Sequence, residues 1–454
     1  MKRDVVVVGA GPGGTLAALL LARLGHRVTI YERRPDLRTT VQSAGRSINL
    51  ALANRGLKAL RLAGVEPAVD KLLTVMRGRM VHHLGGDLDL QAYGQRPHEV
   101  IYSVSRPGLN AVLLDAAEAA GVHIVFNTRC SDVNVAKSEL ELVDEVSGAV
   151  RRIAFRHCIA SDGAGSVIRA QLMKQPSYVG SEQIQAHGYK ELSILADSEG
   201  RHRMDPNALH IWPRGGYMLI ALPNVDGSFT VTLFLANAGE PSFRSLRTPL
   251  DVREFFEQQF PDVIDKIHDL EDSFFANPTG LLGTVRCHPW NLDDRILLLG
   301  DAAHAIVPFY GQGMNCALED CIELDRCVTE HVLDWNLAFR KFSEIRKPNA
   351  DAIADMAQQN YIEMRDSVRD PDFLLRQAVG FELQRRWPDR FCPRYSMVMF
   401  RDDLSYEEAL RRGEIQEEIL LSLTKDKSSV SSVDYQRAAQ MLAKRLTPLP
   451  RANA

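Results

Sequence analysis

The sequence predicts a mixed α/β (α+β) fold with a Rossmann-like domain, an interleaved, mainly β part and a C-terminal helical region. Three patterns indicate these parts. A β-branched run at residues 5–8 leads directly into a cluster of glycines, residues 228–234 alternate between apolar and polar side chains, and residues 406–423 carry apolar side chains at helical spacing.

The first pattern predicts a buried strand followed by a phosphate-binding turn. Residues 5–8 are all valine, as is typical of a parallel strand that is buried on both faces. Gly9, Gly11 and Gly14 then form GxGxxG, followed by a helix that ends near Gly25. The first glycine permits a tight turn, the second lets the backbone approach a pyrophosphate, and the third lets the helix pack on the strand. Gly13 belongs to the same cluster.

A second strand is expected at residues 27–31, with Glu32 at its end. An acid about 20 residues beyond the glycines can accept a hydrogen bond from a ribose hydroxyl. The order strand, glycines, helix, strand and acid predicts a dinucleotide site, but it does not choose between NAD and FAD. No second GxGxxG follows a strand, so we expect a single dinucleotide domain.

Composition places the chain among ordinary globular proteins. It has 454 residues, 45% hydrophobic and 25% charged, with a formal net charge of −4, which gives no reason to expect nucleic acid as a partner. The basic, apolar N-terminus resembles a signal peptide, but the glycines interrupt it and a second strand follows. No run of about 18 apolar residues occurs, so we expect a cytoplasmic protein without a membrane anchor.

The cysteine pattern favours a reducing compartment. The count is odd and no CxxC pair occurs, which argues against a disulfide framework. A metal site was considered because three cysteines fall close together, but on a predicted helix Cys321 points away from Cys316 and Cys327, and no histidine has ligand spacing. We therefore expect no metal, with these cysteines as small core residues.

Two later segments are typical of flavoproteins. Residues 158–169 contain the Asp162-Gly163 pair, and residues 295–304 form an apolar strand that ends at Gly300-Asp301. These segments resemble the DG and GD fingerprints of the single-component aromatic hydroxylases related to 4-hydroxybenzoate hydroxylase. In that family the acid at Asp301 holds the flavin ribityl chain. The helix opened by residues 311–315 can direct its N–H groups toward the flavin pyrimidine edge.

The resemblance implies a GR-type FAD-binding domain, with NADPH as a transient co-substrate that has no Rossmann domain of its own, and O2 as the oxidant. It implies that NADPH reduces FAD and that a flavin C4a-hydroperoxide transfers oxygen to an aromatic ring. The residues expected to bind the cofactor are Gly9, Gly11, Gly13, Gly14, Glu32, Arg33, Leu50, Ala51, Arg106, Cys130, Asp162, Asp301, Gly313, Met314 and Asn315.

More specific strings are similar to the group of these hydroxylases that converts L-kynurenine to 3-hydroxy-L-kynurenine, in tryptophan degradation toward NAD. They are spread over residues 45–52, 77–82, 187–192, 207–213, 228–234, 308–315 and 393–398. Some members of that group carry a C-terminal membrane anchor. Here residues 434–454 are amphipathic and contain proline, so we expect none.

The same resemblance implies a substrate pocket. Arg79 and Tyr93, joined by Asn360 and Tyr395, match residues that hold the amino-acid carboxylate, and a planar guanidinium suits that task because it binds a carboxylate through two hydrogen bonds. We expect the alternation in residues 228–234 to form a half-buried strand. The residues expected around the substrate ring are Leu209, Ile220, Leu222, Thr232 and Phe234, with Phe309 and Tyr310 beside the flavin.

No acid–base residue is expected, because the aniline nitrogen of kynurenine already activates the ring position that is attacked. Alternatives remain open: an aromatic hydroxylase for another aromatic acid, a flavin halogenase or epoxidase, or a non-enzymatic flavin scaffold. The oligomeric state, monomer or homodimer, also remains open. We expect the FAD-binding domain at 1–75, 100–180 and 285–345, the substrate domain at 76–99 and 181–284, and the helical region at 346–454.

Overall fold

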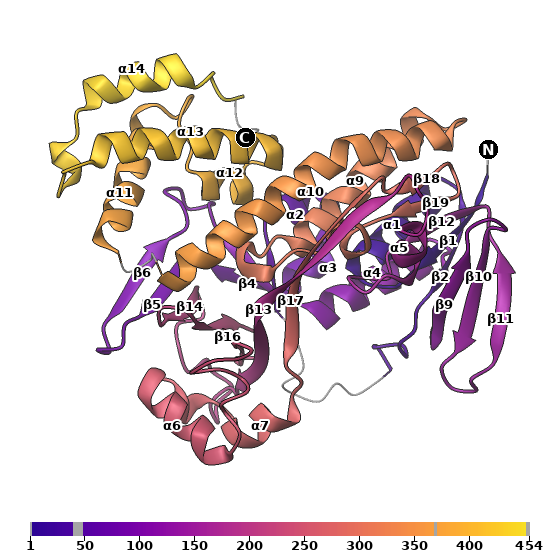
Figure 1. Ribbon diagram of the computed structural model, residues 1–454, viewed down its shortest axis with the longest axis horizontal. Helices are drawn as coiled ribbons and strands as arrows, with labels where there is room; N and C mark the ends of the chain where they lie inside the picture. Colours follow the sequence, from indigo (N-terminus) through magenta and orange to yellow (C-terminus); the bar gives the residue numbers. More distant parts are fainter. Residues whose placement is uncertain (1, 40–48, 367–369, 451–454) are drawn as a thin grey trace. The chain divides into compact units, whose positions relative to one another are not determined.

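A computed structural model describes residues 2–39, 49–366 and 370–450, so residues 45–48 of the first family-like string lie outside it (Figure 1). The chain divides into two compact units. The first unit comprises Met1–Leu73, Ser103–Gln185 and Leu281–Ala354, and the second comprises Thr74–Tyr102, Ala186–Gly280 and Asp355–Ala454. The three-part division expected from the sequence remains a prediction.

The first unit is built on a six-stranded sheet in the order β18-β19-β12-β1-β2-β8. All neighbouring strands are parallel except the edge pair β18–β19. The strand and helix expected before and after the glycines are confirmed, and the second strand begins and ends where it was expected. The bounds are β1 (Asp4–Val8), α1 (Pro12–Arg23), β2 (Arg27–Tyr31), β8 (His123–Val125), β12 (His157–Ala160), β18 (Asn291–Leu292) and β19 (Ile296–Leu298).

Helix α1 packs against α4 and α9. Smaller elements complete the unit, including the antiparallel sheet β9-β10-β11. Their bounds are β3 (Asn49–Leu52), α2 (Asn54–Leu62), α3 (Glu66–Val69), η1 (Asp70–Leu72), β4 (Leu73–Met76), β7 (Ile101–Ser105), α4 (Arg106–Ala119), β9 (Thr128–Asn134), β10 (Glu139–Asp144), β11 (Val150–Ala154), α5 (Val167–Leu172), β17 (Gly280–His288), α8 (Asp301–His304), η3 (Pro308–Tyr310), α9 (Gly313–Glu330) and α10 (Trp335–Asp366). Strand β4 and helix α10 continue into the second unit, which includes Thr74–Tyr102 and Asp355–Ala454.

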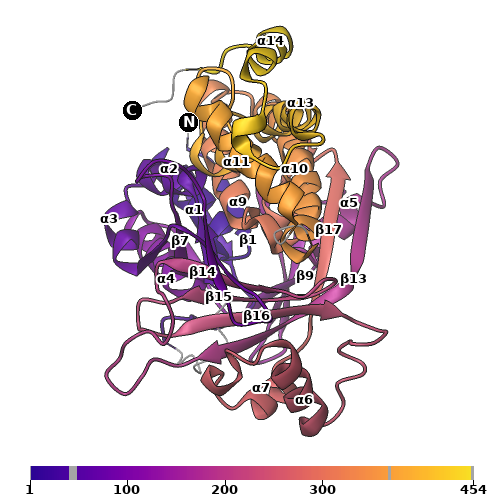
Figure 2. The same cartoon turned by 90° about the vertical axis from the view of Figure 1, so that its left-hand side faces the viewer.

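The strands β13-β16-β15-β14-β5-β6, in this order, are part of a seven-stranded sheet that begins with β17, and they form the centre of the second unit. Its strands are antiparallel, apart from the parallel pair β14–β5. Helices α6 and α7 cover one face of this sheet (Figure 2). The bounds are β5 (Gly78–His82), β6 (Leu88–Ala92), β13 (Val179–Ile194), β14 (Ala208–Pro213), β15 (Met218–Pro223), β16 (Phe229–Ala236), α6 (Pro249–Gln259), η2 (Ile264–Lys266) and α7 (Leu270–Ala276).

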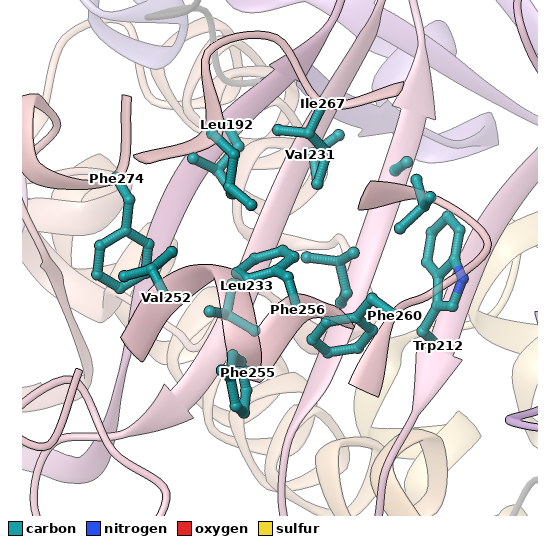
Figure 3. Close-up of a cluster of buried hydrophobic side chains, with 14 of the residues drawn as sticks. Leu192, Trp212, Val231, Leu233, Val252, Phe255, Phe256, Phe260, Ile267 and Phe274 are labelled. Carbon is teal, nitrogen blue, oxygen red and sulfur yellow. The ribbon is translucent and has the colours of Figure 1, made fainter. Parts of the chain in front are cut away.

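The expectation that residues 228–234 form a half-buried strand is wrong in one respect. Strand β16 is present, but Val231 and Leu233 on one face and Thr230 and Phe234 on the other are all buried. Val231 and Leu233 pack into a core with the phenylalanines of α6, of which Phe256 is fully buried (Figure 3). Helices cover one face of this sheet, and the other face is buried as well. The alternation of polar and apolar residues in the sequence therefore does not reveal that both faces are buried.

The expected C-terminal helical region is confirmed. Its helices share an apolar core that includes Leu383, Phe391 and Ile419. No helix among the described residues is long and apolar enough to cross a membrane. The bounds are α11 (Pro371–Arg386), α12 (Arg394–Phe400), α13 (Tyr406–Thr424), η5 (Val430–Ser432) and α14 (Tyr435–Arg445).

Candidate functional site

The carboxyl ends of four parallel strands meet at one edge of the sheet in the first unit. Gly9 follows β1, Glu32 follows β2, Asp162 lies two residues beyond β12, and Asp301 opens α8 after β19. Strand β1 lies between β2 and β12, so the connections leave it in both directions. Ligands of open parallel sheets bind at such a point, which brings the three expected fingerprints together.

Close packing requires glycine at two positions of the loop. Gly9 has φ +100°, and a Cβ there would lie 2.3 Å from the Ser161 carbonyl oxygen. A Cβ on Gly14 would lie 2.2 Å from the carbonyl oxygen of Gly9, whereas one on Gly13 would make only ordinary contact with Ala317 of α9. Gly9 and Gly14 therefore let the loop pack closely against the end of β12.

Gly11 differs, because a Cβ there would meet nothing within 4 Å. Gly11 is the N-cap of α1, and no side chain among the described residues caps that helix end. Asn110 on α4 donates from Nδ2 to the Ala10 carbonyl at 2.9 Å, while its buried Oδ1 has no partner in the described chain. Open space in front of unsatisfied N–H groups and a positive helix end fits a pyrophosphate.

Glu32 lies close to the same loop. Its Oε2 accepts from the Ala10 N–H at 2.7 Å and its Oε1 accepts from the Arg34 N–H at 3.0 Å. The carboxylate therefore holds the glycine loop beside the end of β2, where a ribose hydroxyl can reach it. Arg33, the next residue, is exposed.

Asp162 and Cys130 have structural partners as well. Asp162 accepts from Ser166 Oγ at 2.6 Å and from the Val167 N–H at 2.9 Å, and so ties the DG turn to the start of α5. Burial raises the pKa of Asp162, against these hydrogen bonds. Burial also raises the pKa of the Cys130 thiol on β9 to about 12, so this thiol is neutral. Contact of either residue with a cofactor remains a prediction.

The start of α9 is connected to β3 through Asn315. Its Oδ1 accepts from the Ala53 N–H at 2.9 Å, and its Nδ2 donates to the carbonyls of Ala51 and Gly311 at 2.8 and 2.9 Å. Gly311 has φ +64°, and a Cβ there would lie 2.8 Å from that of Ala51. Asn315 thus holds the end of β3 and the Gly311 turn against the start of α9. The remaining ones lie on or beside these elements: Leu50 on β3, Arg106 at the start of α4, and Gly313 and Met314 at the start of α9.

A buried charged cluster behind α8 was missed from the sequence. The ligand-type atoms of His304, Cys316 and Asp320 lie within 4.8 Å of one another, although no histidine had ligand spacing in the sequence. His304 and Asp320 hydrogen-bond at 2.5 Å, and Arg346 donates to Asp320 at 2.7 Å. Because the carboxylate is already held by two cationic side chains, the cluster is a hydrogen-bonded ion network. Cys321 instead donates to the Gly13 carbonyl, as its expected direction implied.

In the second unit, Arg79 lies beside two stacked tyrosines. Its Cζ is 5.8 Å from the ring of Tyr93 and 5.1 Å from the ring of Tyr395, and these two rings stack at 5.2 Å. Arg79 is 8% exposed and Tyr93 is 5% exposed. Burial raises the pKa of Tyr93, so its hydroxyl stays protonated and can donate a hydrogen bond. The arrangement suits a carboxylate ligand.

Glu363 on α10 is a further polar residue beside Arg79 that the sequence did not reveal. Its Oε1 lies 3.5 Å from Nη1 of Arg79. Asn360, which was expected in the site, precedes it by three residues on the same helix and so lies on the same helical face. Asn360 is 2% exposed, and its Nδ2 lies 3.3 Å from the Met364 sulfur.

The expected apolar wall lies on the sheet face opposite α6 and α7. Leu209 pairs with Arg79 across β14 and β5, and Ile220 pairs with Thr232 across β15 and β16. Because side chains alternate along a strand, Leu222 and Phe234 share this face. The structure therefore places six of the expected residues on one face of the sheet: Arg79, Leu209, Ile220, Leu222, Thr232 and Phe234. Phe309 and Tyr310 are buried in η3 of the first unit.

Comparisons with known proteins agree in both sequence and fold. The family model for the FAD binding domain matches residues 2–354. A kynurenine 3-monooxygenase of Xanthomonas axonopodis pv. citri (strain 306) is 47% identical over 452 residues, covering 100% of this chain and 99% of its own length. One of Myxococcus xanthus (strain DK1622) is 46% identical over 454 residues, covering 100% and 97%.

Solved structures show the same fold at low identity. The chain is similar to 2-methyl-3-hydroxypyridine-5-carboxylic acid oxygenase, with a TM-score of 0.63, 19% identity, and coverage of 84% of this chain and 98% of the other. It is also similar to p-nitrophenol 4-monooxygenase of Pseudomonas putida DLL-E4, with a TM-score of 0.64, 18% identity, and coverage of 93% and 97%.

Proposed function

The chain belongs to the FAD-binding-domain family and, within it, to the kynurenine 3-monooxygenases, and from this premise we propose that it hydroxylates L-kynurenine at ring position 3. FAD is its bound cofactor, and NADPH and O2 are its co-substrates. The expected cofactor residues of the first unit hold FAD, with the pyrophosphate at Gly11 and the ribose at Glu32.

The observation that carries the substrate assignment is the buried guanidinium of Arg79 beside the stacked rings of Tyr93 and Tyr395. Glu363 already lies 3.5 Å from this guanidinium, and the planar fork can in addition bind a ligand carboxylate with two hydrogen bonds. The adjoining sheet face is mainly apolar and accommodates an aromatic ring. The ligand that fits is an aromatic compound with a carboxylate on a side chain.

When bound, FAD supplies the redox chemistry: it accepts electrons from NADPH and activates O2. The residues of the chain position the ring and exclude water. Arg79, Tyr93, Asn360 and Tyr395 hold the amino-acid end, and the wall that includes Leu222 holds the ring. No protein base is needed, because the aniline nitrogen donates electrons to the ring carbon that is attacked. The residues of the site therefore act by orienting the substrate ring.

We also infer a cytoplasmic location. All seven cysteines are buried as free thiols, which suits a reducing compartment.

The test measures NADPH oxidation and identifies products with L-kynurenine, salicylate and 4-hydroxybenzoate. We expect L-kynurenine to accelerate flavin reduction strongly and to yield 3-hydroxykynurenine. Efficient turnover of either simple acid, without turnover of kynurenine, would leave an aromatic hydroxylase and overturn the substrate assignment. A correctly folded protein that takes up no FAD on titration would overturn the proposal as a whole.

A further inference from the structure

The turn between β19 and α8 has an unusual backbone. Gly300 has φ +60° and ψ −140°, and a Cβ there would lie 3.2 Å from Ala317 of α9. The next residue is Asp301, the exposed acid that opens α8 at the carboxyl edge of the sheet. The direction of the Asp301 side chain therefore depends on what holds this turn in place.

One buried carboxylate holds both ends of α8. Oδ2 of Asp320 on α9 accepts from the Gly300 N–H at 3.1 Å, just before the helix begins. The same oxygen contacts Nε2 of His304, the last residue of α8, at 2.5 Å. Asp301 lies between these two attachment points. Asp320 is fully buried, so water does not compete for these hydrogen bonds.

Groups behind the helix keep Asp320 in place. Its Oδ1 accepts from Nε of Arg346 at 2.7 Å, and the ring of His304 stacks on Trp290 at 5.0 Å. Burial opposes the charged form of His304, but the facing carboxylate dominates and raises its pKa, so the imidazole is protonated. Burial likewise opposes ionisation of Asp320, yet His304 and Arg346 lower its pKa. The pair is therefore an imidazolium and a carboxylate.

We propose that Asp320 is a positioning residue for the flavin, which clamps both ends of α8 and thereby presents Asp301 to FAD. The proposal rests on the FAD site proposed above. Asp320 makes no contact with the ligand in this role, and it acts through the turn and through His304.

Glu319 provides a matched control. It is the neighbour of Asp320 on α9 and also belongs to the buried network, since it pairs with Arg55 at 2.8 Å and with Arg346 at 2.7 Å. Among the described residues, Gly300 and His304 hydrogen-bond to Asp320 and not to Glu319. Loss of buried charge pairing alone should therefore affect Glu319→Gln and Asp320→Asn alike, whereas loss of the clamp affects only Asp320→Asn.

The experiment titrates FAD into apoprotein and measures the thermal midpoint of each apoprotein separately. We expect Asp320→Asn to weaken FAD binding about tenfold or more relative to Glu319→Gln, a difference of about 1.4 kcal/mol. A double-mutant cycle with Asp301→Ala gives a second readout. The loss caused by Asp301→Ala should be large in the wild type and small once Asp320 is asparagine, because a misdirected Asp301 has little left to lose.

Equal FAD affinities of Asp320→Asn and Glu319→Gln would show that Asp320 has a purely structural role and would overturn the inference. Additive losses of FAD affinity in the double mutant with Asp301→Ala would do the same. If Asp320→Asn does not fold, His304→Gln tests the same clamp from the other side, with the same cycle. Wild-type protein that binds no FAD would instead refute the proposed function, so the two failures are distinguishable.

Discussion

Nη1 of Arg79 lies 3.5 Å from Oε1 of Glu363, so the guanidinium expected to bind a substrate carboxylate already faces a carboxylate of the chain. The Arg79 side chain is 9% exposed and that of Glu363 is 27% exposed. An incoming carboxylate must share or replace this partner. A ligand that also carries an ammonium group offers Glu363 a new partner, as an α-amino acid does.

Arg79→Ala should weaken L-kynurenine binding by about ten- to a hundredfold, since a charge-assisted hydrogen bond is worth about 1.5–3 kcal/mol. Arg79→Lys should recover only part of the loss, because an ammonium lacks the planar fork. Titration of flavin absorbance measures both dissociation constants. The control is Arg77→Ala, two residues earlier and exposed, and FAD binding should be unchanged in all three variants.

Decarboxylated kynurenine allows a thermodynamic cycle that combines the Arg79→Ala change with removal of the ligand carboxylate. It should bind the wild type poorly and lose little more in Arg79→Ala, because the group that Arg79 addresses is missing from the ligand. Fully additive losses, or an unchanged dissociation constant for L-kynurenine, would remove Arg79 from the site.

Glu363→Gln should change selectivity. A neutral amide no longer competes for Arg79, so kynurenine without its α-amino group should bind about two- to fivefold more tightly than to the wild type, as for a partly exposed ion pair. L-kynurenine should gain less, because its ammonium loses a partner. The ratio of the two dissociation constants is the measurement. A ratio equal to that of the wild type would mean that Glu363 does not interact with the amino group of the ligand.

Gly11→Val should leave the fold intact and abolish most FAD binding. Its backbone is extended (φ −69°, ψ 171°) and a Cβ meets nothing within 4 Å, so the side chain costs the apoprotein little. It would occupy the space through which the pyrophosphate passes, and we expect affinity to fall by about tenfold or more. Gly85→Val, at an equally open exposed position, is the control. Normal FAD uptake by Gly11→Val would place the phosphates elsewhere.

The stability of the second unit should fall on acidification through His210. Burial lowers the pKa of His210 to about 4. Its Nε2 contacts the Asp205 carbonyl at 2.8 Å and its Nδ1 faces Nε2 of His82 at 2.8 Å, while Nδ1 of His82 faces Asp262 at 2.6 Å. Burial outweighs the nearby oxygens of Asp205 and Asp262, which favour the charged form. The unfolded chain takes up a proton on this imidazole near pH 6.5, whereas the folded chain takes it up only near pH 4. The free energy of unfolding is therefore highest above pH 6.5 and falls by up to about 3 kcal/mol as the pH drops toward 4.

Urea unfolding between pH 4.5 and 7.5 tests this dependence. The midpoint of the wild type should fall with pH through this window, whereas that of His210→Gln should fall less, because glutamine does not titrate. Parallel curves for the two proteins would mean that other groups cause the acid sensitivity.

The sequence by itself determined the nucleotide-binding half of the protein. The run of valines, the glycine spacing and the acid at Glu32 are local signals, since strand, turn and helix are set by neighbouring residues. The alternation of residues 228–234 predicted a strand, which is β16, but not the burial of both its faces. The family-like strings named Arg79 and Tyr395, which the structure brings together.

Only the tertiary structure decided which distant side chains become partners. Glu363 reaches Arg79 because α10 carries it to the end of β5, and Asp320 reaches Gly300 because α9 packs behind α8. Burial of both faces of β16 required α6 to cover one of them. Periodicity reports which face of an element a residue occupies, but the element that covers this face, and the charge it brings, follow from packing between segments far apart in the chain.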